Sequence, residues 1–498
     1  MPVYLNTEIE TLTHMVTLGG SFWIFERKCW NEGHKNKKSF MDRYIDGFMK
    51  WMPESLFICF ILTFLVIGMA VFMTDTPFIG TEKTGGIIYG WVNGFWGLLS
   101  FAMQMTILLA TGNAVASSPP AHKMFKFLAK LPKSRTQIFI FSIIVGSIFG
   151  FLHWGLGMMV AIVFGKELLV QARQKGIKVH TPLFVATLFF TFLPATSGLS
   201  GAAVLYSATP NYLRNSVAEA YKQLVPESVP LTSSVLNVHF ISLLIVCMLV
   251  PLCFALFVHP KDESKIVELD DDIYMNSING TAHIEISRNT PAEKMNSSRL
   301  VMYIIGSAIF GYSVYQFSIV GLSGLDLNSF NFLFLGLGLL LCGQQGPEYY
   351  AALFKDGVMS SWGLVLQFPF YAGIFGIIQS TGLGLEISHF FVSISNGTTW
   401  PVFAYLYSAL LNIAVPSGGS KFVIEAPYIV PASIEVGNDL GRILQAYQLG
   451  DATTNLIVPF WALSYLSNFK LKFNQIVAYT IPCVLVVSGI VIVYLLAF

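Results

Sequence analysis

The hydrophobic positions of this chain fall in long runs that contain no Lys, Arg, Asp or Glu. Such runs cover residues 56–73, 84–121, 136–165, 179–213 and 474–498. A helix that crosses a bilayer needs about 20 consecutive, mostly apolar residues. The pattern therefore predicts an all-α polytopic membrane protein.

We predict about nine transmembrane helices, at residues 54–73, 95–116, 182–208, 235–258, 300–320, 329–345, 361–382, 441–467 and 474–497. Lys and Arg crowd the cytoplasmic ends of membrane spans, so their distribution indicates orientation. The loops on one side of these spans hold 24 of the 29 Lys and Arg residues, and those on the other side hold four. The basic N-terminal segment lies on the richer side, which predicts a cytoplasmic N-terminus.

Two uncharged segments, 136–165 and 401–432, do not fit as simple spans. The first has basic residues at both ends, so both ends are expected in the cytoplasm, and the second enters from the opposite side. Each is interrupted near its middle, at residues 153–157 and 415–420, by glycines that favour a turn. Each half reads as too short to span, which predicts two opposed re-entrant helical hairpins.

The two halves of the chain repeat one order of elements. Residues 95–99 (FWGLL) recur as 361–365 (SWGLV), and a broken span follows each hairpin, with breaks at 194–201 and 450–455. We predict a cytoplasmic extension (1–50), a first repeat (51–258), a cytoplasmic linker (259–299), a connecting span (300–328) and a second repeat (329–498). One extra span between the copies inverts the second copy, and inverted repeats with broken helices indicate a transporter's central site.

The turns at the hairpin tips leave backbone N–H groups without helical partners. These groups and the helix dipole can bind an anion without a buried cation. The first broken span could add further oxygens. The residues expected to bind substrate in this way are Ser417, Gly418, Gly419, Ser420, Lys421, Trp154, Gly155, Gly157, Thr196 and Ser197. For any one such cluster, close helix packing is the alternative explanation.

Four ionisable side chains, His153, Lys421, Glu425 and Asp451, lie at membrane depth in these elements. A charge there is costly, so each invites an explanation. Lys421 and Glu425 are four residues apart and either neutralise each other or serve a substrate carboxylate and a proton. His153 is either a hydrogen-bonded tip residue or functional. The coupling cation is expected at Asp451, Thr453, Asn455 and Glu425, with Na⁺ near Asp451 as one possibility.

Composition agrees with a membrane protein, since 54% of the residues are hydrophobic and only 11% are charged, against about 25% charged in soluble domains. The net charge of +1 indicates no nucleic-acid partner. The six cysteines are scattered, without a CxxC pair, so neither a disulfide framework nor a zinc site is indicated. We expect no cofactor. A membrane-embedded enzyme would need a clustered catalytic constellation, and none is recognisable.

Several motifs resemble the bacterial short-chain fatty acid transporter family. They are residues 93–121, 364–374 (LVLQFPFYAGI), 412–432 (NIAVPSGGSKFVIEAPYIVPA) and 458–463 (VPFWAL), and the resemblance covers about residues 50–498. It implies uptake of acetoacetate- or butyrate-like acids. The architecture of the family is similar to that of the transporter group that contains the dicarboxylate/sodium symporters. This resemblance implies that the protein forms a homodimer and transports by an elevator motion.

Together these observations predict a secondary transporter of the inner (plasma) membrane that carries a short-chain monocarboxylate by H⁺ or Na⁺ symport. The alternatives are a carrier of dicarboxylates or other organic anions, a passive channel and a membrane-embedded enzyme. A dicarboxylate carrier should show a second polar subsite or additional cations in the cavity.

Overall fold

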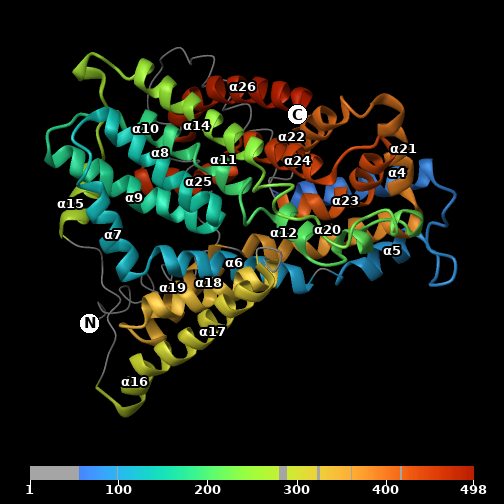
Figure 1. Ribbon diagram of the computed structural model, residues 1–498, viewed down its shortest axis with the longest axis horizontal. Coiled ribbons are helices and arrows are strands. Elements are labelled where there is room, and N and C mark those ends of the chain that lie inside the picture. Colours follow the sequence, from blue (N-terminus) through green and yellow to red (C-terminus); the bar gives the residue numbers. More distant parts are fainter. Residues whose placement is uncertain (1–54, 98, 280–288, 322–325, 361, 415–417) are drawn as a thin grey trace, which may run out of the picture. The chain divides into compact units, whose positions relative to one another are not determined.

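The computed structural model describes residues 55–498 except 98, 280–288, 322–325, 361 and 415–417 (Figure 1). The predicted extension 1–50 lies outside the described residues. In the described part the chain is helical, with an isolated bridge between Thr81 and Gly85 and no strand. The all-α prediction is confirmed.

The first half of the described chain runs from α4 to α14. Its helices are α4 (Ser55–Met73), α5 (Ile87–Gly94), α6 (Leu99–Ala116), α7 (Pro119–Ala129), α8 (Arg135–Leu152), α9 (Trp154–Gln174), α10 (Thr181–Phe189), α11 (Phe192–Thr196), α12 (Ala202–Ala208), α13 (Tyr212–Ser216) and α14 (Val238–Val258). A single 3₁₀ turn, η1 (Glu219–Tyr221), precedes α14.

The linker between the halves contains short elements: η2 (Glu263–Lys265), α15 (Asp271–Asn279) and α16 (Pro291–Asn296). The rest of the chain forms α17 (Arg299–Val320), α18 (Leu327–Cys342), α19 (Pro347–Ser360), α20 (Trp362–Thr381), α21 (Leu383–Ile394), α22 (Trp400–Ala414), α23 (Gly418–Glu435), α24 (Leu440–Asn455), α25 (Pro459–Phe469) and α26 (Phe473–Ala497).

Local sequence signals place many of these boundaries. Ser134, Asn237 and Asp439 cap α8, α14 and α24, because their side chains accept from backbone N–H groups of the first turn. Pro182 and Pro459 sit in the first turns of α10 and α25, where a missing N–H costs nothing.

Each of the nine predicted spans coincides with a helix or a broken series of two or three helices. Among the described residues five helices are long and apolar enough to cross a membrane, and the pair α20–α21, bent by 80°, is a sixth candidate. Large apolar side chains such as Phe64, Phe72, Phe257 and Leu485 are exposed on the helices. Apolar surface of this extent is expected against lipid and not against water.

The first predicted hairpin is formed by α8 and α9, which pack against each other and are joined by His153 alone. Its arms extend over 135–174 and have 18 and 21 residues, so the prediction that each half is too short to span is wrong. The helix α9 continues through Lys166 and Glu167. The uncharged run on which the prediction was based marks only the apolar part of this helix and not its end. The second hairpin corresponds to α22 and α23, and residues 415–417 at its tip lie outside the described residues.

The first broken span is interrupted at 197–201, within the predicted break at 194–201, and also at 190–191, which was not predicted. The second break is one turn later than predicted, because α24 stays helical through Asn455 and the interruption falls at 456–458. The hydroxyl of Thr453 bonds to the Leu449 carbonyl within the helix. Pro459, which lacks an N–H, then ends the hydrogen-bond ladder.

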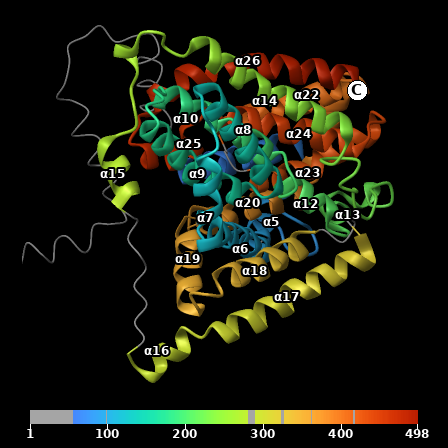
Figure 2. The same ribbon diagram turned by 60° about the vertical axis from the view of Figure 1, so that its left-hand side comes forward.

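The same order of helices occurs twice. The first series consists of the helices α4–α7, the hairpin α8–α9, the broken span α10–α12 and the helix α14. The second series has the same order: the helices α18–α21, the hairpin α22–α23, the broken span α24–α25 and the helix α26. The helix α17 lies between the two series and packs along α18, at the edge of the molecule in Figure 2. Prediction from sequence assigned the segments of α5, α7, α19 and α21 to loops, and so missed these shorter helices in both series.

The close approach of α8 and α9 generates a prediction about stability. A methyl group at Gly157 would collide with the Cα of Gly150 on the facing helix. We expect Gly157→Ala to lower the free energy of unfolding by about 1–3 kcal/mol, because backbone atoms must move apart. Thermal unfolding of the detergent-purified protein measures this loss.

The matched control is Gly311→Ala, since Gly311 is also helical and has no heavy atom within 4 Å of an added methyl. An equal loss of stability in both variants would contradict the tight contact between α8 and α9.

Candidate functional site

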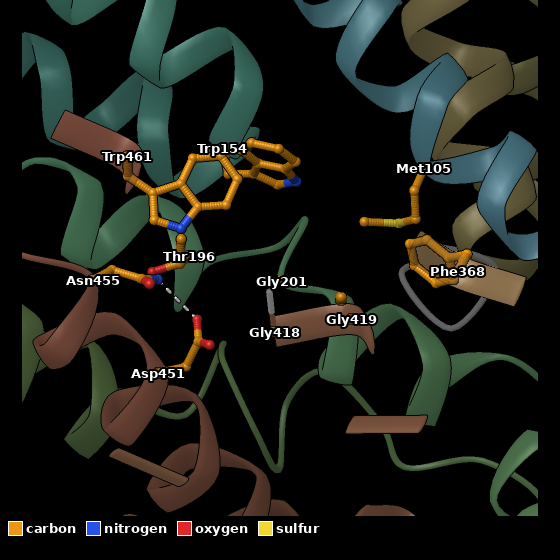
Figure 3. Close-up of a pocket in the computed structure, with 11 residues that line it drawn as sticks. Met105, Trp154, Thr196, Gly201, Phe368, Gly418, Gly419, Asp451, Asn455 and Trp461 are labelled. Atoms are coloured by element: carbon orange, nitrogen blue, oxygen red, sulfur yellow. Dashed lines mark hydrogen bonds between the residues drawn. The ribbon is translucent and has the colours of Figure 1, made fainter. Parts of the chain in front are cut away.

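Six helix ends meet around one small cavity of about 60 Å³ (Figure 3). The N-terminal residues of α9, α12, α23 and α25 line it, and so do the C-terminal residues of α11 and α24. The full lining comprises Met105, Trp154, Thr196, Gly201, Ala202, Phe368, Gly418, Gly419, Asp451, Asn455 and Trp461. Both hairpins and both broken spans therefore contribute to one site.

The N-termini of α9 and α23 present different groups to the cavity. At α9, the Trp154 N–H donates to Ser200 Oγ at 2.7 Å and the Leu156 N–H donates to His153 Nδ1 at 3.2 Å. At α23, Gly418 and Gly419 face the cavity without side chains, so a ligand can approach the backbone. The start of α9 is therefore already capped, and the start of α23 is the candidate anion subsite.

One wall of the cavity is aromatic. Trp154 and Trp461 meet edge to face with ring centroids 5.4 Å apart, and they lie across the cavity from Met105 and Phe368 (Figure 3). These apolar side chains surround the space next to the polar helix ends. The site can hold a small molecule with one charged end and a short hydrocarbon tail.

The carboxylate of Asp451 lies beside the first residue of α23. A methyl group at Gly418 would be 3.2 Å from its Oδ2, and the same oxygen accepts from Asn455 Nδ2 at 3.0 Å. A carboxylate at a helix N-terminus is stabilised by the dipole. Asp451 is the one ionisable group among the described lining residues.

Lys421 is fully buried and pairs with Asp451, with 3.3 Å between Nζ and Oδ1. Its ammonium also donates to the carbonyl and hydroxyl oxygens of Ser408, at 2.9 and 2.7 Å, and lies 4.7 Å from the centre of the Tyr447 ring. Sequence reasoning considered a pairing of Lys421 with Glu425 on the same helix, but the ion pair of Lys421 is formed with Asp451 on α24. Lys421 itself does not line the cavity.

Glu425 is fully buried on α23. Within the described part of the chain neither carboxyl oxygen has a hydrogen-bond partner of normal length. The Tyr447 hydroxyl lies close enough to interact with the carboxyl, but it donates to the Gly418 carbonyl at 3.4 Å. Tyr447 therefore contacts both Glu425 and Gly418, and Gly418 lines the cavity.

Asn412, a residue that sequence reasoning did not select, organises the end of α24. Its Nδ2 donates to the Asp451 carbonyl at 3.0 Å, to Thr454 Oγ1 at 3.0 Å and to Asn455 Oδ1 at 2.7 Å. The sequence did contain a signal for Asn412, since it is an amide side chain within the apolar run of α22. A buried amide needs hydrogen-bond partners, so such a residue indicates a polar contact inside the protein. Ser408, Tyr447, Met105 and Trp461 were also missed.

The structure brings together only some of the predicted site residues. Trp154, Thr196, Gly418, Gly419, Asp451 and Asn455 line the cavity. The others do not: Gly157 packs on Gly150, Gly155 lies against Leu109 and His153, Ser197 is buried at the end of α11, and Thr453 bonds to Tyr405. Ser417 lies outside the described residues, and the side chain of Ser420 is not described.

His153 is a buried cap residue. Its ring accepts from the Leu156 N–H and contacts Phe334 with centroids 4.5 Å apart. No group of three His, Cys, Asp or Glu side chains that could hold a metal ion occurs in the part of the chain that the structure describes.

Three comparisons relate this chain to known proteins. A family model described as "Short chain fatty acid transporter" matches residues 38–498. Two relatives carry the name "Putative short-chain fatty acid transporter". The one from Escherichia coli is 32% identical and covers 91% of this chain and 97% of its own. The one from Haemophilus influenzae is 31% identical, with 91% and 98% covered.

The fold also has a solved counterpart. The crystal structure of the Alcanivorax borkumensis YdaH transporter, described as having an unusual topology, superposes with a TM-score of 0.59 at 15% identity. The match covers 89% of this chain and 98% of that one. The likeness extends over nearly the whole of both molecules and concerns the fold.

The buried pair of Lys421 and Asp451 generates a prediction about stability. We expect Lys421→Met or Asp451→Asn alone to cost about 3–5 kcal/mol of unfolding free energy, because either change leaves a charge buried without its partner. The double variant should lose clearly less than the sum of the two. Unfolding midpoints of the three variants in one detergent measure this coupling.

If the two losses simply add, the two side chains do not stabilise each other and the pairing is contradicted.

Proposed function

The chain belongs to the short-chain fatty acid transporter family, and from this premise we propose that it is a secondary active transporter of short-chain monocarboxylates. The observation that carries the proposal is the cavity at which the N-termini of both hairpin helices α9 and α23 meet the C-termini of α11 and α24. Paired broken helices that turn opposite dipole ends toward one site are the arrangement by which transporters bind an anion and a coupling cation.

The size of the cavity supports a small substrate. A cavity needs about 10–15 Å³ of such space to hold one water-sized group, and the 60 Å³ of this cavity exceed that only several-fold. A short acid suits this space better than a large one. The substrate carboxylate docks on the backbone at Gly418 and Gly419, and its alkyl chain contacts Trp154 and Trp461.

The charges of the site support a monocarboxylate over a dicarboxylate. A second carboxylate would need a second subsite, and none of the described lining residues is cationic. The nearby ammonium of Lys421 already has an oxygen of Asp451 and two oxygens of Ser408 as partners. A single carboxylate, in contrast, is served by neutral backbone donors at a helix N-terminus.

We extend the proposal to the transport cycle. The hairpins α8–α9 and α22–α23 enter from opposite faces of the inner membrane, and each returns to its own face. For α8–α9 this is supported by the basic residues at both of its ends, Arg135 and Arg173. The two helix series form an inverted repeat, and the N-terminus is cytoplasmic. The cavity lies between α6 and α20 on one side and α9, α11, α23 and α24 on the other. A site on such a boundary suits an elevator motion within a homodimer, driven by symport of H⁺ or Na⁺.

Two functions of other classes have less support. An enzyme needs a nucleophile or an acid–base pair near the substrate, and Asp451 is the one ionisable side chain among the described lining residues. A passive channel would dissipate a substrate gradient and could not accumulate substrate, which the following experiment separates.

We expect purified protein in proteoliposomes to accumulate C2 to C4 monocarboxylates above their equilibrium level when a proton or sodium gradient is imposed. Initial uptake rates over protein-free vesicles, for a panel of C2 to C6 mono- and dicarboxylates, provide the measurement. Protein-free vesicles correct for diffusion of the undissociated acids. Preference for dicarboxylates would reject the proposed substrate, and uptake that stops at equilibrium would indicate a channel.

Trp154 should set the length of the alkyl chain. We expect Trp154→Ala to shift the preference toward C5 and C6 acids by roughly tenfold, because an apolar pocket distinguishes one methylene by about 1–3 kcal/mol. Trp96→Ala serves as the control, since Trp96 is exposed and lies outside the cavity lining. An unchanged length profile in Trp154→Ala would remove the alkyl chain from this wall.

A further inference from the structure

Two carboxyl groups are buried near the proposed substrate site, and they differ in whether they form an ion pair. Asp451 has the Lys421 ammonium at 3.3 Å. Glu425, one helical turn after Lys421 on α23, forms no ion pair among the described residues and has no hydrogen bond of normal length beyond its interaction with Tyr447. The two groups therefore cannot have the same role in coupling.

The surroundings of the Lys421 ammonium are those of a bound alkali cation. Its neighbours are a carbonyl oxygen and a hydroxyl oxygen of Ser408, a carboxylate oxygen of Asp451 and the face of the Tyr447 ring. Carbonyl, hydroxyl and carboxylate oxygens are also the ligands that hard metal cations prefer. The ammonium thus occupies the position beside Asp451 that a coupling Na⁺ would need.

The described groups around Glu425 include one cation, Lys421, and that cation already forms an ion pair with another carboxylate. Tyr407 on α22, Tyr428 on α23 itself and Tyr447 and Asp451 on α24 interact with it electrostatically. The cation nearest in sequence, Lys421, also interacts with Glu425, but its printed bonds go to Ser408 and Asp451. Ionised Glu425 would add a net negative charge to a buried site.

The other helices that pack on α23 bring no cation to Glu425. The helix α20 has no charged residue and α12 has none. On α21, Glu386 is exposed and His389 faces Glu435 at 3.8 Å, at the opposite end of α23. On α13, Arg214 donates to the Val225 carbonyl. The described surroundings of Glu425 therefore favour its uncharged, protonated form.

We propose that Glu425 carries the coupling proton and that Lys421 permanently replaces a coupling metal cation, so that transport is proton-coupled and independent of sodium. The proposal rests on the proposed function and names its coupling ion. A substrate carboxylate at Gly418 and an ionised Glu425 are like charges in a buried site. Each opposes the other, so binding the anion strengthens binding of the proton, and the reverse follows by linkage.

The chemical step is a proton transfer without covalent change. On the loading side the Glu425 carboxylate takes one proton from water as the anion binds. On the release side the carboxyl O–H gives that proton back to water as the anion leaves. Tyr447, which lies by Glu425 and bonds to Gly418, connects the proton site with the substrate site. One negative charge and one proton cross together.

The test is the affinity of the wild-type protein for butyrate in nanodiscs between pH 5.5 and 9, by calorimetric titration in sodium and in choline buffers. Butyrate stays ionised at neutral and alkaline pH, as model carboxyls do. We expect an affinity that is constant at low pH and then weakens with rising pH, by up to about tenfold per unit. Exchanging sodium for choline should leave it unchanged.

The decisive variant is Glu425→Gln, which mimics the protonated carboxyl. Its butyrate affinity should stay constant over the whole pH range, and in proteoliposomes it should exchange butyrate across the membrane but not accumulate it under a proton gradient. The matched control is Glu386→Gln on the adjacent α21, which is exposed and should keep the wild-type pH profile.

A second variant tests the role of Lys421. We expect Lys421→Ala to bind butyrate more tightly in sodium than in choline, by at least several-fold, because the space beside Asp451 becomes free for an added cation. The Glu425→Gln profile remains informative if this variant does not fold.

The possible failures are distinguishable. No butyrate binding by the wild-type protein at any pH would reject the proposed function and, with it, this inference. Binding that requires sodium, that does not vary up to pH 9, or that keeps its pH dependence in Glu425→Gln would reject the inference alone.

Discussion

The structure depends on how helix ends are satisfied away from water. A helix that stops inside an apolar environment leaves N–H or C=O groups that cost several kcal/mol each if they have no partner. This protein places six helix ends around one cavity and bonds part of them to nearby side chains, as Ser200 does for Trp154 and Asn412 for the end of α24. The polar character of the site comes from these ends, in a wall that is otherwise aromatic.

The same constraint explains the pairing of Lys421 with Asp451. Either charge alone would be expensive to bury, and together they form a neutral unit with Ser408 and Tyr447 around the ammonium. The pair links α23 to α24, which belong to the second hairpin and the second broken span. The pair therefore fixes the position of α23 relative to α24, and the ends of both helices line the cavity.

Two neighbouring carboxyls consequently have different surroundings. Asp451 belongs to an ion pair at the edge of the cavity, whereas Glu425 is buried without an ion pair of its own among the described residues. A group whose charge is opposed by its surroundings is suited to change its protonation. The aromatic wall of Trp154 and Trp461 adds no charge to the cavity.

The uncharged runs and the glycine-rich interruptions were enough to predict an all-helical membrane protein, its spans and the break near Ser197, because apolar length and turn chemistry are local properties. The end of α24 at Asn455 and the true length of α9 were not predicted, since helices continue through charges that find partners in other helices. The tertiary structure alone decided which carboxylate forms the ion pair with Lys421. Glu425 is adjacent along its own helix, but Asp451, 30 residues away in sequence, is adjacent in space once α23 packs against α24.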